Sequence, residues 1–213
     1  MTDKDLVHYV IIVDRSGSMQ SIKTDTEGGI RAFIDGQLEG VDSAKRTVSF
    51  FQFDTAHDCL WDFTPLEKAK GYTLEPRGMT ALLDACGRAI TDVGRTLKNT
   101  SEDKRPGQIM VVIATDGQEN SSKEYSRAEI KKMIEHQQDT YGWKFTYIGA
   151  NQDVFAEAGS LGISRDSAIC FTAQGPEVAS VWASASAGVS MSTAPTSGSV
   201  TYSSTQRREA MGK

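Results

Sequence analysis

The sequence predicts an α/β domain with a doubly wound, mostly parallel central sheet, one antiparallel edge strand and helices on both faces. Two observations support this prediction. Apolar runs rich in β-branched and aromatic residues, which are typical of strands buried on both faces, recur along the chain. Segments with helical spacing of apolar residues separate most of these runs, and parallel strands require such crossovers.

The expected strands follow one another in chain order. The first, 8–13, has the near-continuous apolar sequence HYVIIV, and the second, 47–53, reads TVSFFQF. The third, 59–63, follows the second across a short polar turn, so we expect these two strands to pair in antiparallel fashion. The remaining strands are expected at 108–115 (QIMVVIAT), 144–149 (KFTYIG) and 168–172 (AICFT).

The expected helices lie mostly between these strands. The segment 19–38 carries a helical stripe of apolar residues after its first turn, although two adjacent glycines weaken its middle. The segment 80–97 has apolar residues at helical spacing, and 127–138 is amphipathic. Two further helices are expected at 154–161 and, after the last strand, at 177–189.

The chain is expected to form one domain over residues 1–190, followed by a tail. Its 213 residues suffice to bury roughly 70% of the surface that the unfolded chain exposes, so folding requires no disulfide or metal ion. Residues 191–213 are rich in Ser and Thr, and few of them are apolar. We predict that this segment is a flexible tail, or that it orders only on a partner.

The composition argues against several classes of protein. The formal net charge of -5 disfavours a general nucleic-acid binder, which would carry a basic face. The three cysteines are widely spaced and include no CxxC pattern, so neither a disulfide framework nor a zinc cluster is expected. No stretch approaches the ~20 apolar residues of a membrane span, and the N-terminus lacks the pattern of a signal peptide. We therefore expect a cytoplasmic protein.

Oxygen-bearing side chains cluster at three expected loops. Asp14, Ser16 and Ser18 follow the first strand at alternate positions. Asp116 follows the 108–115 strand, and Thr80 precedes a helix. Ligand sites in α/β sheets lie outside the carboxyl ends of the strands, and hydroxyl and carboxylate oxygens without Cys or His suit a hard cation such as Mg²⁺. Asp and Ser also form turns and cap helices, so the prediction depends on the three loops together.

These three segments resemble the metal-ion-dependent adhesion site of the von Willebrand factor A (vWA) domain family. They are, in the order that the family has them, DRSGS (14–18), GMTALLDA (78–85) and TDG (115–117). In organisation the resemblance covers roughly residues 6–190, including the strand VSFFQFD (48–54). The set of motifs is complete, and the stand-alone architecture looks like that of short single-domain members from bacteria and their phages.

The resemblance implies a role for each residue of this set. Ser16 and Ser18 would coordinate a divalent ion through their hydroxyls, while Asp14 would lie at the ion and often act through a water. Thr80 and Asp116 would complete the shell. The implied ion is Mg²⁺, with Mn²⁺ or Ca²⁺ as alternatives. One coordination position would stay open. The site has at most two carboxylates to offset the charge of the ion, and one or both can act through water, so the ion should attract an external Asp or Glu.

The expected partner is therefore a protein that presents Asp or Glu. The family resemblance suggests an AAA-type ATPase, and we expect neither a nucleic acid nor a membrane as partner. Five residues in or beside the three segments are candidate partner contacts: Arg15, Gly78, Met79, Gly117 and Glu119.

The predicted function is a protein interaction module and not an enzyme, with two alternatives. The first is a metal-dependent hydrolase, which would need a general base such as Glu119 beside the ion. The second is a structural or assembly subunit whose ion only stabilises the fold. The sequence patterns of P-loop and dinucleotide enzymes are absent. Ser16 also stands where a phospho-aspartyl phosphatase needs a second carboxylate.

Overall fold

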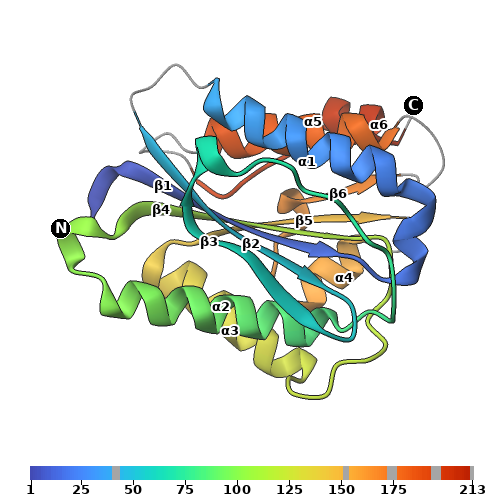
Figure 1. The fold of residues 1–213 in the computed structure, drawn as a ribbon, viewed down its shortest axis with the longest axis horizontal. Helices are drawn as coiled ribbons and strands as arrows, with labels where there is room; N and C mark the ends of the chain where they lie inside the picture. Colours follow the sequence, from blue (N-terminus) through green and yellow to red (C-terminus); the bar gives the residue numbers. More distant parts are fainter. Residues whose placement is uncertain (40–43, 151–153, 172–176, 193–197, 212–213) are drawn as a thin grey trace.

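A six-stranded sheet organises the part of the protein that the computed structural model describes, which is residues 1–39, 44–150, 154–171, 177–192 and 198–211. The strand order is β3-β2-β1-β4-β5-β6 (Figure 1). The strands are β1 (Asp3–Asp14), β2 (Lys45–Phe53), β3 (His57–Pro65), β4 (Pro106–Thr115), β5 (Lys144–Ala150) and β6 (Ala168–Phe171). Only β3 runs antiparallel to its neighbour, β2, and the other pairings are parallel. The predicted fold class is confirmed.

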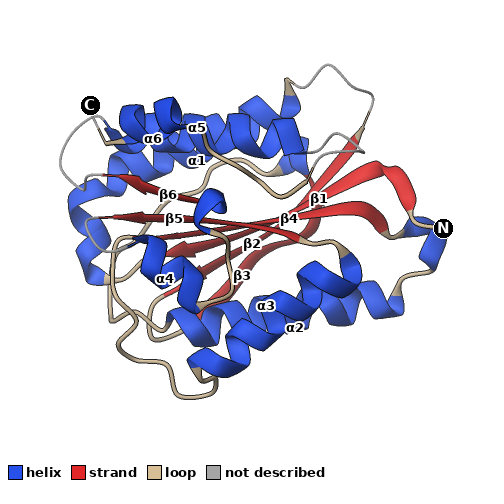
Figure 2. Ribbon diagram, turned by 180° about the vertical axis from the view of Figure 1, so that it is seen from behind, coloured by secondary structure: helices blue, strands red, loops and turns tan. Residues whose placement is uncertain are grey.

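Helices cover both faces of the sheet (Figures 1 and 2). One face carries α1 (Lys23–Leu38), α5 (Glu177–Ser192) and α6 (Ser204–Ala210). The other face carries α2 (Leu82–Asn99), α3 (Arg127–Tyr141) and α4 (Val154–Ser160). Short 3-10 segments lie at Gly17–Ile22, Leu66–Lys68, Glu102–Lys104 and Arg165–Ser167.

The central strand β1 explains why two cores form. Successive side chains of a strand point to opposite faces. Ile11 and Val13 therefore pack beneath α1 and α5, while Val10 and Ile12 pack beneath α2 and α3. All four are buried, as the continuous apolar run predicts for a parallel strand covered on both sides.

Two element boundaries differ from the predictions near the candidate site. The expected 19–38 helix is divided into a 3-10 turn and α1, which begins only at Lys23. The expected 80–97 helix begins only at Leu82, since Ala81 has a non-helical φ of -96° and ψ of 61°, and the backbone N–H groups of Thr80 and Ala81 donate to Asn120 and to Asp54. Both differences occur where the backbone of one loop contacts another loop. The spacing of apolar residues within a single segment cannot predict such contacts. Residue 172, the end of the last expected strand, lies outside the described residues.

The described part of the C-terminal segment, for which we predict a flexible tail over 191–213, packs against the domain. Val200 and Tyr202 are buried, and the Tyr202 hydroxyl lies 2.5 Å from the hydroxyl of Thr146. The Ser167 hydroxyl donates to the carbonyl of Val200 at 2.6 Å, and Ser203 caps α6. A few apolar residues in a Ser-rich segment can therefore attach it, because pre-existing polar groups of the domain satisfy its buried hydrogen-bonding groups.

No helix among the described residues combines the length and the apolar character that crossing a membrane would require.

Candidate functional site

The candidate site lies at the carboxyl ends of β1 and β4, which are neighbours at the centre of the sheet. Val13 pairs with Ala114 in register, so Asp14 and Thr115 end their strands side by side. The chain leaves β1 towards β2 on one side, whereas β5 and β6 lie on the other side. The strand order therefore reverses between β1 and β4, and such reversals are where open α/β sheets bind ligands.

A chain of short hydrogen bonds links the side chains that follow β1 to Asp116. The carboxylate of Asp14 is fully buried and accepts the backbone N–H of Ser16 and the hydroxyl of Thr115, each at 2.6 Å. The Ser16 and Ser18 hydroxyl oxygens lie 3.1 Å apart. The Ser18 hydroxyl donates to Asp116 at 2.7 Å. Four of the five predicted ligands thus form one connected cluster.

Thr80, the fifth predicted ligand, faces the same space beside Gly117. A Cβ at residue 117 would lie 2.9 Å from the Thr80 hydroxyl oxygen and 3.6 Å from both Asp14 Oδ2 and Ser18 Oγ. The missing side chain of Gly117 leaves this space to oxygens from three separate loops. The structure therefore brings all five predicted residues together at one point of the sheet edge.

Hydrogen bonds hold the three loops in fixed positions relative to one another. Thr80 donates its N–H to the side-chain oxygen of Asn120 and accepts the N–H of Asn120, each at 3.0 Å. The N–H of Gly17 donates to the carbonyl of Gly78 at 3.3 Å. The loop carrying Thr80 is thus tied both to the loop after β4 and to the loop after β1.

The two carboxylates of the site lack cationic partners among the described residues. Burial raises the pKa of Asp14 to about 6, although the hydrogen bonds from Thr115 and Ser16 oppose this effect and the charge of Asp116 adds to it. Burial also raises the pKa of Asp116, against the hydrogen bond from Ser18. A buried carboxylate without a counter-ion is unfavourable in its charged form, and a bound cation would reverse that preference.

The donor chemistry fits a hard divalent cation. The cluster offers hydroxyl and carboxylate oxygens only, which suits Mg²⁺, Mn²⁺ or Ca²⁺ better than softer metals. Within the described residues, no group of three or more His, Cys, Asp or Glu side chains could hold a metal ion. A site at Asp14 and Asp116 would therefore depend on Ser16, Ser18 and Thr80 for its remaining protein ligands.

Asp54, which is not among the predicted site residues, organises the region beside the cluster. Its Oδ2 accepts Nε–H of Arg15 at 2.7 Å and Nε–H of Arg77 at 2.8 Å. Its backbone carbonyl accepts the N–H of Ala81 at 3.0 Å. Burial alone would raise the pKa of Asp54, but the hydrogen bonds from Arg77, Ala56 and Arg15 outweigh it and hold the pKa below its usual value. The sequence signal was an Asp directly after β2, one residue beyond the position that pairs with Asp14.

Two of the candidate partner contacts, Arg15 and Glu119, form hydrogen bonds and ion pairs within the chain. Arg15 is only 4% exposed and forms ion pairs with Asp54 and Asp58, so it does not present its charge to a partner. The carboxylate of Glu119 accepts the backbone N–H groups of Leu83, Ser121 and Ser122 and the hydroxyl of Ser122. Glu119 thus caps the first turn of α2, a role that requires a helix from another part of the chain and leaves no signal in its own loop.

The other candidate contacts lie where a partner could reach them. Met79 is 51% exposed, and Gly78 is exposed and has a φ of +68°, which favours glycine. Gly117 is half-buried beside the cluster. These three residues flank the candidate ligands Thr80 and Asp116 in the chain.

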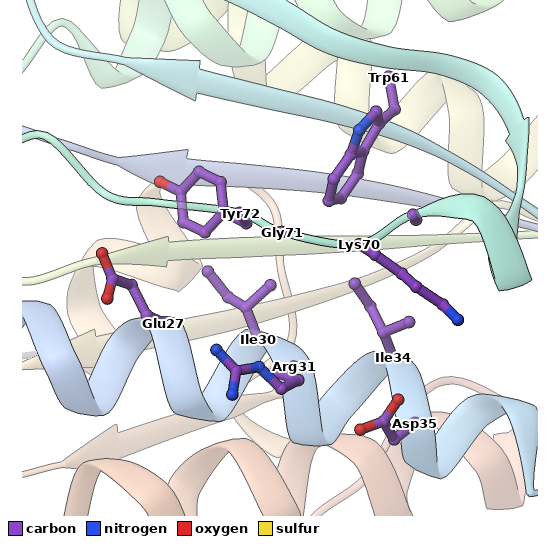
Figure 3. Close-up of a pocket in the computed structure, with 10 residues that line it drawn as sticks. Glu27, Ile30, Arg31, Ile34, Asp35, Trp61, Lys70, Gly71 and Tyr72 are labelled. Carbon is purple, nitrogen blue, oxygen red and sulfur yellow. The ribbon is translucent and has the colours of Figure 1, made fainter.

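A pocket of about 360 Å³ lies elsewhere, between α1 and the segment 69–72 (Figure 3). Trp61 and Tyr72 face Ile30 and Ile34 across it, with charged side chains of α1 and Lys70 around them. None of the predicted site residues lines this pocket. The candidate metal cluster therefore lies apart from this pocket.

Solved structures of vWA domains resemble the chain over most of its length. Proximal thread matrix protein 1 from the mussel byssus matches with a TM-score of 0.64 and 15% identity, over 87% of this chain and 46% of its own. The vWF domain of the type V pili tip protein Mfa5 from Porphyromonas gingivalis gives 0.58 and 12%, over 87% and 94%. A von Willebrand factor type A protein from Catenulispora acidiphila gives 0.56 and 18%, over 87% and 42%.

These matches establish the vWA fold for the described chain. No protein-family model matches the sequence, and a comparison with curated proteins finds no match. The chain spans less than half the length of the mussel protein. One structure of that mussel protein has zinc in its metal-ion-dependent adhesion site.

Proposed function

We propose that this chain is a divalent-metal-dependent protein interaction module, in which the ion binds an acidic side chain of a partner protein. The observation that carries the proposal is the convergence of Asp14, Ser18 and Thr80 oxygens on the space beside Gly117. Three loops of the sheet edge supply these oxygens, and Ser16 and Asp116 are hydrogen-bonded into the same cluster. The zinc-occupied site of the structurally similar mussel protein supports a metal ion at this position of the fold.

The chain's own residues explain why an acidic ligand would be favoured. The hydroxyls of Ser16, Ser18 and Thr80 are neutral donors, so only Asp14 and Asp116 oppose the charge of the ion. A bound divalent cation supplies a local positive charge that a further carboxylate can complete. Ser18 is exposed, which leaves an approach to the cluster from solvent. We propose Mg²⁺ as the ion because hard oxygen donors and few carboxylates suit it, with Mn²⁺ and Ca²⁺ as alternatives.

We favour an interaction module over a hydrolase because of Glu119. A general base must reach the proton that it removes, whereas the oxygens of Glu119 accept four hydrogen bonds at the start of α2 and in its own loop. For the partner, the family resemblance alone leads us to propose an AAA-type ATPase as the first candidate.

Calorimetric titration with Mg²⁺ tests the metal site. We expect Ser18→Ala to weaken Mg²⁺ binding by more than about tenfold, because it removes a ligand and the hydrogen bond to Asp116. Ser101→Ala is a matched control, since Ser101 is exposed and precedes β4 at the opposite end of the sheet. Equal Mg²⁺ affinity in both variants would contradict the metal assignment.

A pull-down with the two variants tests the interaction. Wild type and Ser101→Ala should retain a partner in Mg²⁺ and release it on chelation, whereas Ser18→Ala should not retain it. Retention that survives chelation would instead favour a structural subunit whose ion only stabilises the fold.

A further inference from the structure

Two exposed side chains of different chemistry flank the candidate metal cluster on the same loop. Arg77 and Met79 precede Thr80, and their side chains are exposed by 59% and 51%. Within the described part of the loops that form the cluster, Met79 is the one large apolar side chain that is exposed. A partner that reaches the ion past Thr80 therefore meets an apolar group and a cation.

The guanidinium of Arg77 is held in one orientation. Its Nε–H donates to Asp54 at 2.8 Å, and its backbone N–H donates to the carbonyl of Arg15 at 2.8 Å. Among the described residues, the two terminal nitrogens of Arg77 donate no hydrogen bond, and the side chain is largely exposed. A guanidinium fixed through Nε presents a planar pair of donors, which matches the two oxygens of a carboxylate.

The backbone between Arg77 and Thr80 is also fixed. Gly78 has a φ of +68°, and a Cβ there would lie 3.2 Å from the Cβ of Asp54. The Gly78 carbonyl accepts the N–H of Gly17 at 3.3 Å. The turn that carries Met79 is therefore already held in one conformation. A ligand that covers Met79 would lose little binding free energy to the ordering of this backbone.

We propose that the partner binds through a short acidic–apolar–acidic segment, an inference that rests on the proposed function. The first carboxylate binds at the metal cluster, the apolar side chain covers Met79, and the second carboxylate binds Arg77. Arg77 and Thr80 are three residues apart, so at most roughly 10 Å separates their backbones and about three extended residues of the partner can follow the loop. Of the candidate partner contacts, Met79 would thus touch the partner directly. Arg77 is added as a contact in place of Arg15, which is buried.

Two acidic residues of the chain share the surroundings of Arg77. Asp58 forms an ion pair with Arg15 at 2.6 Å, and Glu75 is exposed two residues before Arg77. The charge of Glu75 opposes a second carboxylate of the partner. We therefore expect Glu75→Gln to strengthen binding of the partner segment, whereas Arg77→Gln should weaken it.

Selection from a random peptide library displayed on phage tests the proposal without knowledge of the natural partner. The immobilised full chain is exposed to the library in Mg²⁺, and bound phage are eluted with a chelator. We expect the eluted peptides to contain an acidic residue, an apolar residue within about two positions of it and a second acidic residue beyond. Selected synthetic peptides are then titrated against variants by fluorescence anisotropy.

Matched variants separate the two contacts from general effects. Arg77→Gln should weaken binding of the selected peptide by about five- to tenfold, as expected for the loss of a charge-assisted hydrogen-bonded pair, and Lys123→Gln should change it little. Lys123 is an exposed cation on the neighbouring loop. Met79→Ser should weaken binding by about threefold or more, whereas Met191→Ser, at an exposed methionine of α5, should not. Mg²⁺ affinity is measured for each variant to confirm that the metal site is intact.

The possible outcomes distinguish this inference from the function on which it rests. Chelator-eluted peptides with one acidic residue and no apolar or second acidic position would overturn the segment while leaving the interaction module standing. Equal peptide affinity in Arg77→Gln and Lys123→Gln would also overturn it. If no peptide binds in a Mg²⁺-dependent manner, the proposed function itself fails, and the inference fails with it.

Discussion

Two buried aspartates lie at the carboxyl ends of neighbouring strands, and they differ in whether an arginine pairs with them. Asp14 ends β1 and Asp54 follows β2, and their side chains are 0% and 2% exposed. Asp54 is held between Arg15 and Arg77, and its pKa lies below the usual value. Asp14 accepts hydrogen bonds from neutral groups only, and its pKa is raised to about 6.

The difference supports the cation site that we propose at Asp14. Arg15 follows Asp14 directly in the chain, but its side chain turns to Asp54 and Asp58. A buried charge is unfavourable unless it is paired, so the fold completes Asp54 itself and leaves Asp14 incomplete. An aspartate that the fold leaves without a cation, beside three hydroxyls and a second carboxylate, is the expected arrangement for a metal site that must exchange a ligand.

The largest expected effect separates the two aspartates by stability. Asp54→Ala should lower the free energy of unfolding by about 3 kcal/mol, because it leaves Arg15 buried with only the half-exposed Asp58 as a partner. Asp14→Asn should change it by less than about 1 kcal/mol without metal, since the loss of one hydrogen bond is offset by removal of a buried charge. Urea denaturation in the presence of a chelator measures both values. Equal losses would show that the two aspartates are structurally equivalent.

The second prediction separates the aspartates by their response to metal. Free Mg²⁺ at a hundred times its dissociation constant should stabilise the wild type by about 2.7 kcal/mol. The same Mg²⁺ should not stabilise Asp14→Asn. Thermal unfolding with Mg²⁺ and with a chelator measures the difference. Stabilisation of Asp14→Asn as large as that of the wild type would place the ion elsewhere.

Most of this contrast could not be read from the sequence. The strand run 8–13 and the DRSGS, GMT and TDG segments predict the sheet edge and the five oxygen donors, because each signal lies within a few residues. The ion pairs of Asp54 join residues 39 and 23 positions apart, and Glu119 caps a helix 36 positions before it. No periodicity or turn preference reports such distant pairings.

The contacts of the C-terminal segment could not be predicted from its composition either. Composition describes an average, and a Ser-rich average predicts a flexible tail. Val200 and Tyr202 are buried, and the Tyr202 hydroxyl reaches Thr146, 56 positions earlier in the chain. A few residues with matching partners on the domain thus attach a segment whose average composition is polar.

His8 is a third buried ionisable group, and unlike Asp54 and Asp14 it lies, among the described residues, beside neither a charged partner nor the candidate metal cluster. Its Nδ1 lies 2.9 Å from the Thr47 hydroxyl, its ring stacks on Phe63, and burial lowers its pKa to about 3. In the unfolded chain His8 gains a proton below pH ~6.5, whereas in the folded chain it stays neutral until about pH 3. The unfolded state therefore binds more protons in this window, and stability falls as the pH is lowered through it.

We expect His8 alone to lower the free energy of unfolding by about 2 kcal/mol between pH 7 and pH 5. Urea denaturation across this range should show a shallower acid slope for His8→Gln than for the wild type. His136→Gln is the control, because His136 is a partly exposed histidine of α3. Identical acid slopes for wild type and His8→Gln would mean that His8 does not stay neutral in the fold.

The smallest expected effect tests the space beside Asp14 itself. Gly117→Ala would place a Cβ 2.9 Å from the Thr80 hydroxyl and 3.6 Å from Asp14 Oδ2, so Thr80 must shift away from the cluster. We expect Mg²⁺ affinity to fall by about tenfold, which corresponds to about 1.4 kcal/mol, while stability in a chelator changes less. Gly94→Ala in α2 is the matched control, because its Cβ would meet no atom within 4 Å. If both variants bind Mg²⁺ like the wild type, Thr80 is not a ligand, and the site reduces to the loops after β1 and β4.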